Sequence, residues 1–189
     1  MSGPGAPGSH DYRTVASREI FDGRVVRLRV DTLTMPGGGT ADREICGHDD
    51  AVAVIALDSE DRITLVRQYR HAVGERLLEL PAGLCDVEGE EPLETGRREL
   101  VEETGLEADS WEPVISIVPS PGFCTERVHV FLATGLREVA RPEAEHEEAD
   151  MSVERMPFAD AVEAVLDGRI VNGIAVAGIL AARAMTARS

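Results

Sequence analysis

The sequence predicts an α/β fold in which helices pack on a mixed β-sheet. An apolar run at 51–57 has the length of a buried strand, and an acidic turn leads from it into a second strand at 63–69. A central helix is expected at about 93–104, and two more helices follow at 159–167 and 173–187. Strands and helices mixed in this way are typical of an α/β sandwich.

Further strands are predicted from alternation and from turn residues. Apolar and polar residues alternate over 25–34, and a Pro/Gly turn leads to a returning strand at 40–47, which predicts an N-terminal antiparallel hairpin. The segment 77–83 is a short apolar strand that runs into a Pro/Gly turn. Asn172 is a suitable N-cap for the last helix. The remaining predicted strands lie at 111–118, 127–133 and 151–156.

Composition indicates a soluble enzyme rather than a binder of nucleic acid or membrane. The 189 residues include 19 basic and 35 acidic side chains, for a formal net charge of −16, so the general surface repels polyanions. No secretory signal is recognisable, and no apolar run approaches the ~20 residues that span a bilayer. The three cysteines form neither a zinc pattern nor an even disulfide set. We therefore expect a cytoplasmic protein.

Three glutamates near the end of the central helix are the most informative feature. Glu99, Glu102 and Glu103 lie at i, i+3 and i+4, a spacing that places their carboxylates on one helical face. Their repulsion costs a few tenths of a kcal/mol per pair, which a bound Mg²⁺ or Mn²⁺ would offset. Gly105 is expected to end this helix. The alternative is a solvated acidic face in which Arg98 pairs with Glu102.

The residues before this helix favour the metal site over the solvated face. The short strand at 77–83 ends in a tight glycine turn, and an acidic loop at 86–91 connects it to the helix. A glycine lets the backbone come close to an ion, and neighbouring carbonyl oxygens can serve as ligands. The order of strand, glycine turn, loop and carboxylate helix therefore suits a site for phosphate and metal.

The stretch 83–106 resembles the Nudix box, a pattern of Gly, five residues, Glu, seven residues, and then Arg-Glu-apolar-x-Glu-Glu-x-Gly-apolar. The second half matches at every fixed position, whereas six residues separate Gly83 from Glu90. The extra residue falls in the loop and leaves the role of Glu90 open. The resemblance extends over about 14–186 and is strongest to bacterial ADP-ribose pyrophosphatases.

This resemblance implies an α/β/α sandwich and metal-dependent hydrolysis of ADP-ribose to AMP and ribose 5-phosphate. Two or three Mg²⁺ ions, or Mn²⁺ in their place, would be held by Glu99, Glu102 and Glu103 with a backbone carbonyl of Ala82 or Gly83. Arg98 is expected to orient a carboxylate of the cluster. The alternatives are hydrolysis of another sugar nucleotide or dinucleotide, or a non-catalytic sensor that keeps the same fold.

The resemblance also implies a general base on a loop beyond the box. The acidic segment 145–150 is the candidate, with Glu148 as the first choice and Glu147 as the second. His146 is the competing base, because an unperturbed histidine titrates near neutral pH.

Several residues are expected to contact the substrate. Pro121 lies 16 residues beyond Gly105, an offset similar to a marker of the ADP-ribose group, and Phe123 follows it. Arg70 suits a phosphate, because a guanidinium binds phosphate oxygens in a bidentate way. Glu79 is a candidate for adenine or ribose.

The resemblance further implies a homodimer in which the N-terminal strands help to build the pocket of the neighbouring subunit, with Arg43 and Glu44 reaching across. The expected organisation is a disordered tail at 1–12, an N-terminal β region for dimerisation and substrate binding at 13–48, and a catalytic domain at 49–189.

Overall fold

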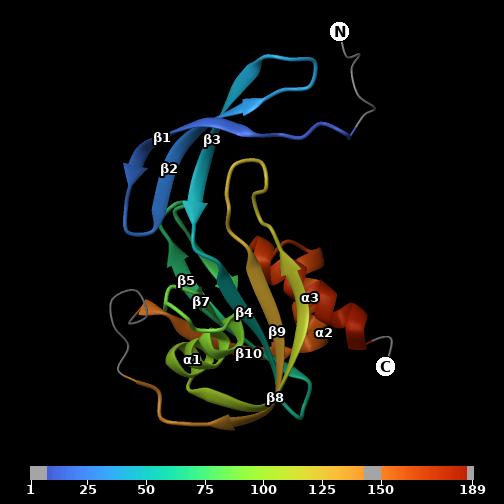
Figure 1. Ribbon diagram of the computed structural model, residues 1–189. Helices are drawn as coiled ribbons and strands as arrows, with labels where there is room; N and C mark the ends of the chain where they lie inside the picture. The colour runs from blue at the N-terminus through green and yellow to red at the C-terminus, as the bar shows by residue number, and fades with distance from the viewer. Residues whose placement is uncertain (1–7, 143–149, 187–189) are drawn as a thin grey trace. The chain divides into compact units, whose positions relative to one another are not determined.

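The computed structural model describes residues 8–142 and 150–186 (Figure 1). These residues form two compact units. The first unit consists of residues 8–49 and 120–126, and the second contains the rest. The first unit therefore includes a segment, 120–126, that is distant from its other residues in the sequence.

The first unit is built on an antiparallel sheet of three strands in the order β1-β2-β3. The predicted hairpin is confirmed as β2 and β3, and the glycines at 37–39 in its turn all adopt positive φ angles. The strand β1 was not predicted. Every residue of β1 is exposed, so its sequence has no buried positions whose spacing would indicate a strand. The strands are β1 (Thr14–Asp22), β2 (Val26–Thr34) and β3 (Thr40–His48).

The second unit contains a mixed sheet of seven strands. The strand order is β10-β5-β4-β9-β8, while β6 pairs with β5 and β7 pairs with β4. The pair β4 and β9 is parallel, and the other pairs of this sheet are antiparallel. The strands are β4 (Ala51–Leu57), β5 (Arg62–Arg70), β6 (Glu75–Glu79), β7 (Ala82–Leu84), β8 (Leu106–Ile117), β9 (Val128–Glu138) and β10 (Ser152–Pro157).

Three helices cover this sheet, with α1 (Pro92–Thr104) on one face and α2 (Phe158–Leu166) and α3 (Gly173–Thr186) on the other (Figure 1). All seven residues of β4 are buried because both faces of this strand are covered. Val52 and Val54 lie beside Gly96 of α1, while Ile55 lies beside Gly178 of α3. The predicted α/β sandwich is thus confirmed.

The boundaries of the predicted elements differ most in β8 and β9. The strand β8 begins at Leu106, directly after α1, whereas the sequence predicted a start at 111. The polar residues at the start of β8 do not alternate clearly, and they form a strand because they pair with β9, from Leu106 opposite Glu138 onwards. Asn172 caps α3 as predicted, since its Oδ1 accepts a hydrogen bond of 2.9 Å from the Ala175 amide. Within the described residues, no helix combines the length and hydrophobicity needed to cross a membrane.

Close packing between α3 and the sheet is tested by enlarging Gly178. A Cβ atom at this position would lie 2.9 Å from Leu80 Cδ1 and 3.2 Å from Val130 Cγ1. We expect Gly178→Leu to lower the free energy of unfolding by about 1–3 kcal/mol, because an extra side chain overpacks the core. Urea denaturation measures the change. Gly173→Ala is the control, since a Cβ at Gly173 meets nothing within 4 Å, and an equal loss in both variants would contradict the packing argument.

Candidate functional site

The helix α1 begins at Pro92, one residue before the predicted start, and ends before Gly105 as predicted. Pro92 occupies the first turn, where backbone N–H groups have no partner within the helix, so the missing N–H of proline costs no hydrogen bond. Gly105 adopts a left-handed conformation with φ of 67°, and its N–H donates to the Val101 carbonyl. The helix packs over β4 and β7, which places Glu99 and Glu103 beside Ala82 and Gly83 of β7.

The carboxylates of Glu99 and Glu103 are buried rather than solvated. Glu99 is 9% exposed and Glu103 is 5% exposed, whereas the Glu102 side chain is 35% exposed. The Ala82 amide of β7 donates a hydrogen bond of 2.9 Å to Glu103 Oε2. The alternative of a solvated acidic face therefore does not describe Glu99 and Glu103.

Gly83 provides the space that Glu99 occupies. A Cβ atom at Gly83 would lie 2.1 Å from both Cδ and Oε1 of Glu99, which is far inside van der Waals contact. The sequence predicted a close approach of backbone to an ion at this glycine. The structure shows a close approach of backbone to a carboxylate, so a side chain at position 83 would displace Glu99.

Arg98 connects the glutamates to the loop before the helix. Its Nη1 donates to Glu99 Oε1 at 2.7 Å and to Glu102 Oε2 at 3.3 Å, and its Nη2 donates to Glu90 Oε2 at 3.2 Å. Burial by itself would lower the pKa of Arg98, but the hydrogen bond to Glu90 and the surrounding carboxylate charges outweigh it and raise this pKa above its usual value. Arg98 therefore stays charged and holds three carboxylates in place.

Glu90 belongs to the same network despite the extra residue in its loop. The Thr95 hydroxyl donates a hydrogen bond of 2.7 Å to Glu90 Oε2. This bond, together with the bond from Arg98, lowers the pKa of Glu90 below its usual value. The insertion after Gly83 is thus absorbed in the loop, and Glu90 lies beside Arg98.

The donors of this cluster suit a hard cation chemically. Carboxylate and carbonyl oxygens are the ligands that Mg²⁺ and Mn²⁺ prefer. In the described part of the chain, no three His, Cys, Asp or Glu side chains converge closely enough to hold a metal ion. In this conformation, Arg98 contacts Glu99 and Glu102 while the Ala82 amide contacts Glu103.

Arg70 and Glu79, both predicted to contact substrate, lie in contact with each other. Glu79 is 2% exposed, and it accepts hydrogen bonds from Arg70 Nε at 2.9 Å and Arg70 Nη2 at 2.6 Å. Gln68 donates a longer bond of 3.4 Å to the same carboxylate. This ion pair gives the buried Glu79 charge its partner.

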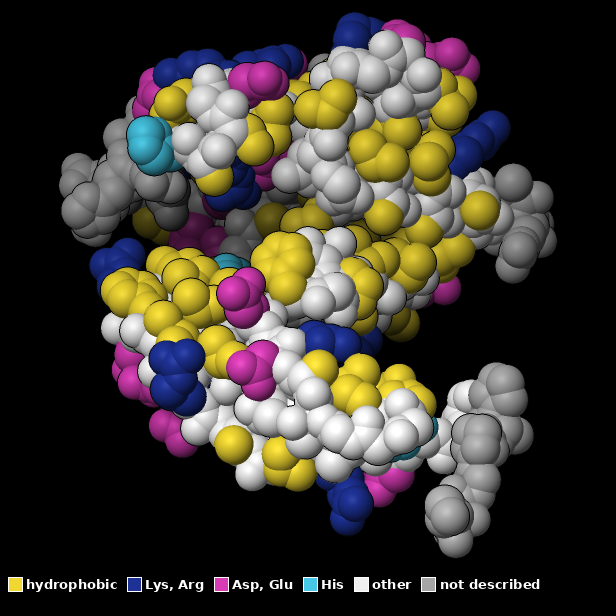
Figure 2. Space-filling model, turned by 90° about the horizontal axis from the view of Figure 1, so that it is seen from above, with side chains coloured by type: hydrophobic (Ala, Val, Ile, Leu, Met, Phe, Trp, Pro, Cys, Tyr) yellow, Lys and Arg dark blue, Asp and Glu magenta, His cyan; other side chains and the backbone are white. Residues whose placement is uncertain are grey.

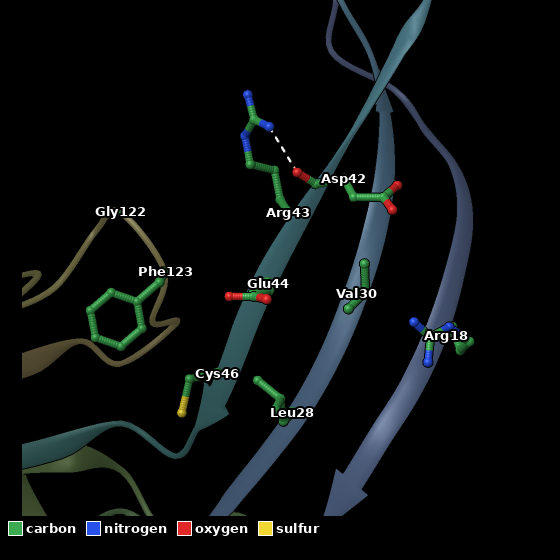
Figure 3. Close-up of a pocket in the computed structure, with 9 residues that line it drawn as sticks. All are labelled: Arg18, Leu28, Val30, Asp42, Arg43, Glu44, Cys46, Gly122 and Phe123. Atoms are coloured by element: carbon green, nitrogen blue, oxygen red, sulfur yellow. Dashed lines mark hydrogen bonds between the residues drawn. The ribbon is translucent and has the colours of Figure 1, made fainter.

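A second group of predicted residues lines a cavity of about 680 Å³ in the first unit. Arg43 and Glu44 reach it from β3, and Phe123, which is 57% exposed, reaches it from the loop at 120–126 (Figure 3). Pro121 lies in the same loop. Cys46 also lines this cavity, and no local pattern could have identified it because its neighbours in the cavity come from distant positions in the sequence.

The predicted bases Glu147 and Glu148, and the competing His146, lie outside the described residues.

Comparisons with known proteins agree with the box and the fold. The NUDIX domain model matches residues 47–172. An ADP-ribose pyrophosphatase of Mycobacterium tuberculosis is 52% identical over 94% of this chain and 86% of its own length. A methanol dehydrogenase activator of Bacillus methanolicus is 40% identical over 83% of this chain and 80% of its own. A crystal structure of an ADP compounds hydrolase, at 19% identity, superposes with a TM-score of 0.82 over 95% of this chain and 96% of its own. This chain therefore belongs to the Nudix hydrolase family.

Proposed function

We propose that this chain hydrolyses ADP-ribose to AMP and ribose 5-phosphate with the help of Mg²⁺ or Mn²⁺. The observation that carries the proposal is the burial of Glu99 and Glu103 against the strand β7, within a box whose second half is complete. Burying two carboxylates beside each other is costly unless cations compensate them. The similarity to an ADP-ribose pyrophosphatase over most of both chains supports the choice of substrate.

The metal ligands in this proposal are the carboxylates of Glu99, Glu102 and Glu103, together with a carbonyl oxygen of Ala82 or Gly83. Two or three bound ions would supply charge neutralisation of the diphosphate and acidification of water. Neutralisation matters here because the net charge of −16 otherwise repels an anionic substrate.

Other side chains position the carboxylates and accept the proton of the attacking water. Arg98 orients Glu99 and Glu102, so that their carboxylates keep one arrangement. Glu148, or Glu147 in its place, takes a proton from the attacking water. The water oxygen bonds to one phosphorus, and the bridging oxygen leaves with the other.

The substrate contacts also remain part of the proposal. Arg70 contacts a phosphate, which requires it to share its guanidinium between the substrate and Glu79. Arg43 and Glu44, which line the cavity of the first unit, reach the substrate pocket of the neighbouring subunit in this proposal. Phe123, which lines the same cavity, packs against a sugar or base. The residues assigned to substrate binding are Arg43, Glu44, Arg70, Glu79, Pro121 and Phe123.

The reaction is tested by incubating the protein with ADP-ribose and Mg²⁺ in water enriched in heavy oxygen. We expect AMP and ribose 5-phosphate, and mass analysis of both products identifies the phosphorus that is attacked. UDP-glucose, GDP-mannose, NADH and diadenosine polyphosphates are assayed in parallel. A higher kcat/KM for one of these compounds would overturn the choice of ADP-ribose.

The role of Glu103 is tested by Glu103→Gln. We expect kcat to fall by more than about 100-fold, because the neutral amide no longer compensates a cation near the diphosphate. Thermal melting checks that the fold is kept. Glu94→Gln is the matched control on the same helix, since Glu94 is exposed and pairs with Arg97; its kcat should stay within about twofold. Retained activity in Glu103→Gln would remove Glu103 from the metal site.

The space at Gly83 is tested by Gly83→Ala. The added Cβ overlaps the Glu99 carboxylate, so this side chain must leave its position. We expect kcat to fall about 10–100-fold, which is the usual loss when residues that orient a metal ligand are changed. Raising the Mg²⁺ concentration should restore part of the activity. Wild-type kinetics in this variant would show that the position of Glu99 is unimportant.

We further propose that the chain is a homodimer and that β1 of the first unit contributes to the interface. Exposed apolar side chains occur on this unit, and hydrophobic areas are visible on the face of the molecule drawn in Figure 2. Val15, Ile20 and Phe21 of β1 are each more than 40% exposed. A second copy of the chain is an occupant that would remove these side chains from water.

We also propose that the protein is located in the cytoplasm, where cysteines usually remain without disulfides, as the three cysteines do here.

The dimer is tested by Phe21→Asp, which places a charge on the apolar surface of β1. We expect a shift from dimer to monomer in sedimentation equilibrium, because burying an unpaired charge opposes association. Leu166→Asp is the control, since Leu166 is also an exposed apolar residue but belongs to α2. A wild-type protein that sediments as a monomer would contradict the proposal.

A further inference from the structure

Two cysteines that are far apart in the sequence are neighbours in the first unit. Cys46 of β3 forms an isolated parallel bridge with Cys124 of the loop at 120–126. The Cys46 amide donates to the Phe123 carbonyl at 2.7 Å, and the Thr125 amide donates to the Cys46 carbonyl at 3.0 Å. These two bonds flank Cys124 on both sides, so they fix the backbone of the loop opposite Cys46.

The backbone spacing of such a pairing falls within the Cα range that a disulfide spans. Backbones joined by such bonds run about 4.8 Å apart, and disulfides join Cα atoms that are roughly 4.4–6.8 Å apart. Residues directly opposite each other in a ladder also point to the same side. The two sulfur atoms can therefore meet without a large movement of either segment.

Both thiols are reduced and half-buried. Burial raises the pKa of the Cys46 thiol, and Cys124 raises it further through its charge and a side-chain hydrogen bond. This shift keeps the Cys46 thiol protonated at neutral pH. The third cysteine, Cys85, is also reduced and half-buried but belongs to the second unit, so it serves as an internal control.

We propose that Cys46 and Cys124 are a site of reversible oxidation, at which a low-molecular-weight disulfide such as oxidised glutathione converts the two thiols into one disulfide. The thiolate of one cysteine attacks a sulfur of the oxidant, forms a mixed disulfide and releases one thiolate of the reagent. The second cysteine then attacks the protein sulfur of this mixed disulfide and releases the other. Two electrons and two protons pass from the protein to the reagent, which is reduced to two thiols.

The bond would join the two walls of the cavity in the first unit. Figure 3 shows Cys46 on β3, the strand that carries Arg43 and Glu44, with Phe123 on the facing loop. Phe123 directly precedes Cys124. Oxidation therefore restrains Phe123 relative to β3, and reduction leaves the loop held by backbone hydrogen bonds.

The test is incubation of the full-length protein with oxidised glutathione, followed by acid quenching, a count of thiols after unfolding, and peptide mapping. We expect the count to fall from the three cysteines of the chain to one. A peptide pair should join Cys46 to Cys124, and the intact mass should be lower by two hydrogen atoms. Reduced glutathione should reverse the change. Hydrogen exchange at 120–126 should be slower in the oxidised protein than in the reduced protein.

Variants distinguish this site from general thiol chemistry. Cys85→Ser should still form the linked peptide pair, whereas Cys46→Ser and Cys124→Ser should not. Thermal melting checks the fold of each variant, and Cys46→Ala provides a second version of the substitution. The proposal is overturned if all three thiols survive in the wild type, if stable glutathione adducts or intermolecular disulfides form in place of the internal link, or if the link contains Cys85.

Discussion

The burial of two like-charged carboxylates, Glu99 and Glu103, is the constraint on which the rest of the site depends. An unpaired buried charge costs about 3–5 kcal/mol, so each carboxylate of this pair needs a donor or a positive charge beside it. The Ala82 amide and Arg98 do so in the described structure. Because Glu99 lies where a side chain of residue 83 would be, this position of the Glu99 carboxylate requires a glycine in β7.

The sheet explains how such a cluster is held in place. The strand β4 is covered on both faces, which makes it the rigid centre of the second unit. The strand β7 pairs with β4, and α1 packs over both, so the donor amides and the acidic helix are positioned by the same buried strand. Gly96 allows α1 to approach this strand closely, since a Cβ there would lie 3.2 Å from Val52 Cγ2.

Arg98 holds several carboxylates of the site in place at the same time. A guanidinium has several donors in a fixed plane, so it can hold Glu90, Glu99 and Glu102 at once. A lysine has the same charge but lacks this planar fork. The same guanidinium also holds the loop with the extra residue to the helix, through its hydrogen bond to Glu90.

Local signals in the sequence were sufficient for the helix ends, the central strands and the acidic face of α1. Gly105 at the end of α1 and Asn172 before α3 act through their own backbone and side-chain geometry, which does not depend on distant residues. The strand β1 and the start of β8 were missed or misplaced. Their exposed or polar residues are held in strands by pairing with β2 and β9, and a pairing partner is not visible in a local window.

By itself, then, the sequence determined the type of fold, the family and the carboxylates of the box, because each rests on spacing along a single helix or strand. The tertiary structure decided that Glu99 and Glu103 are buried, that Glu79 is the partner of Arg70, and that Cys46 lies opposite Cys124. Burial and pairing depend on which segments come into contact when the chain folds. These contacts involve residues far apart in the sequence, so no periodic pattern in the sequence predicts them.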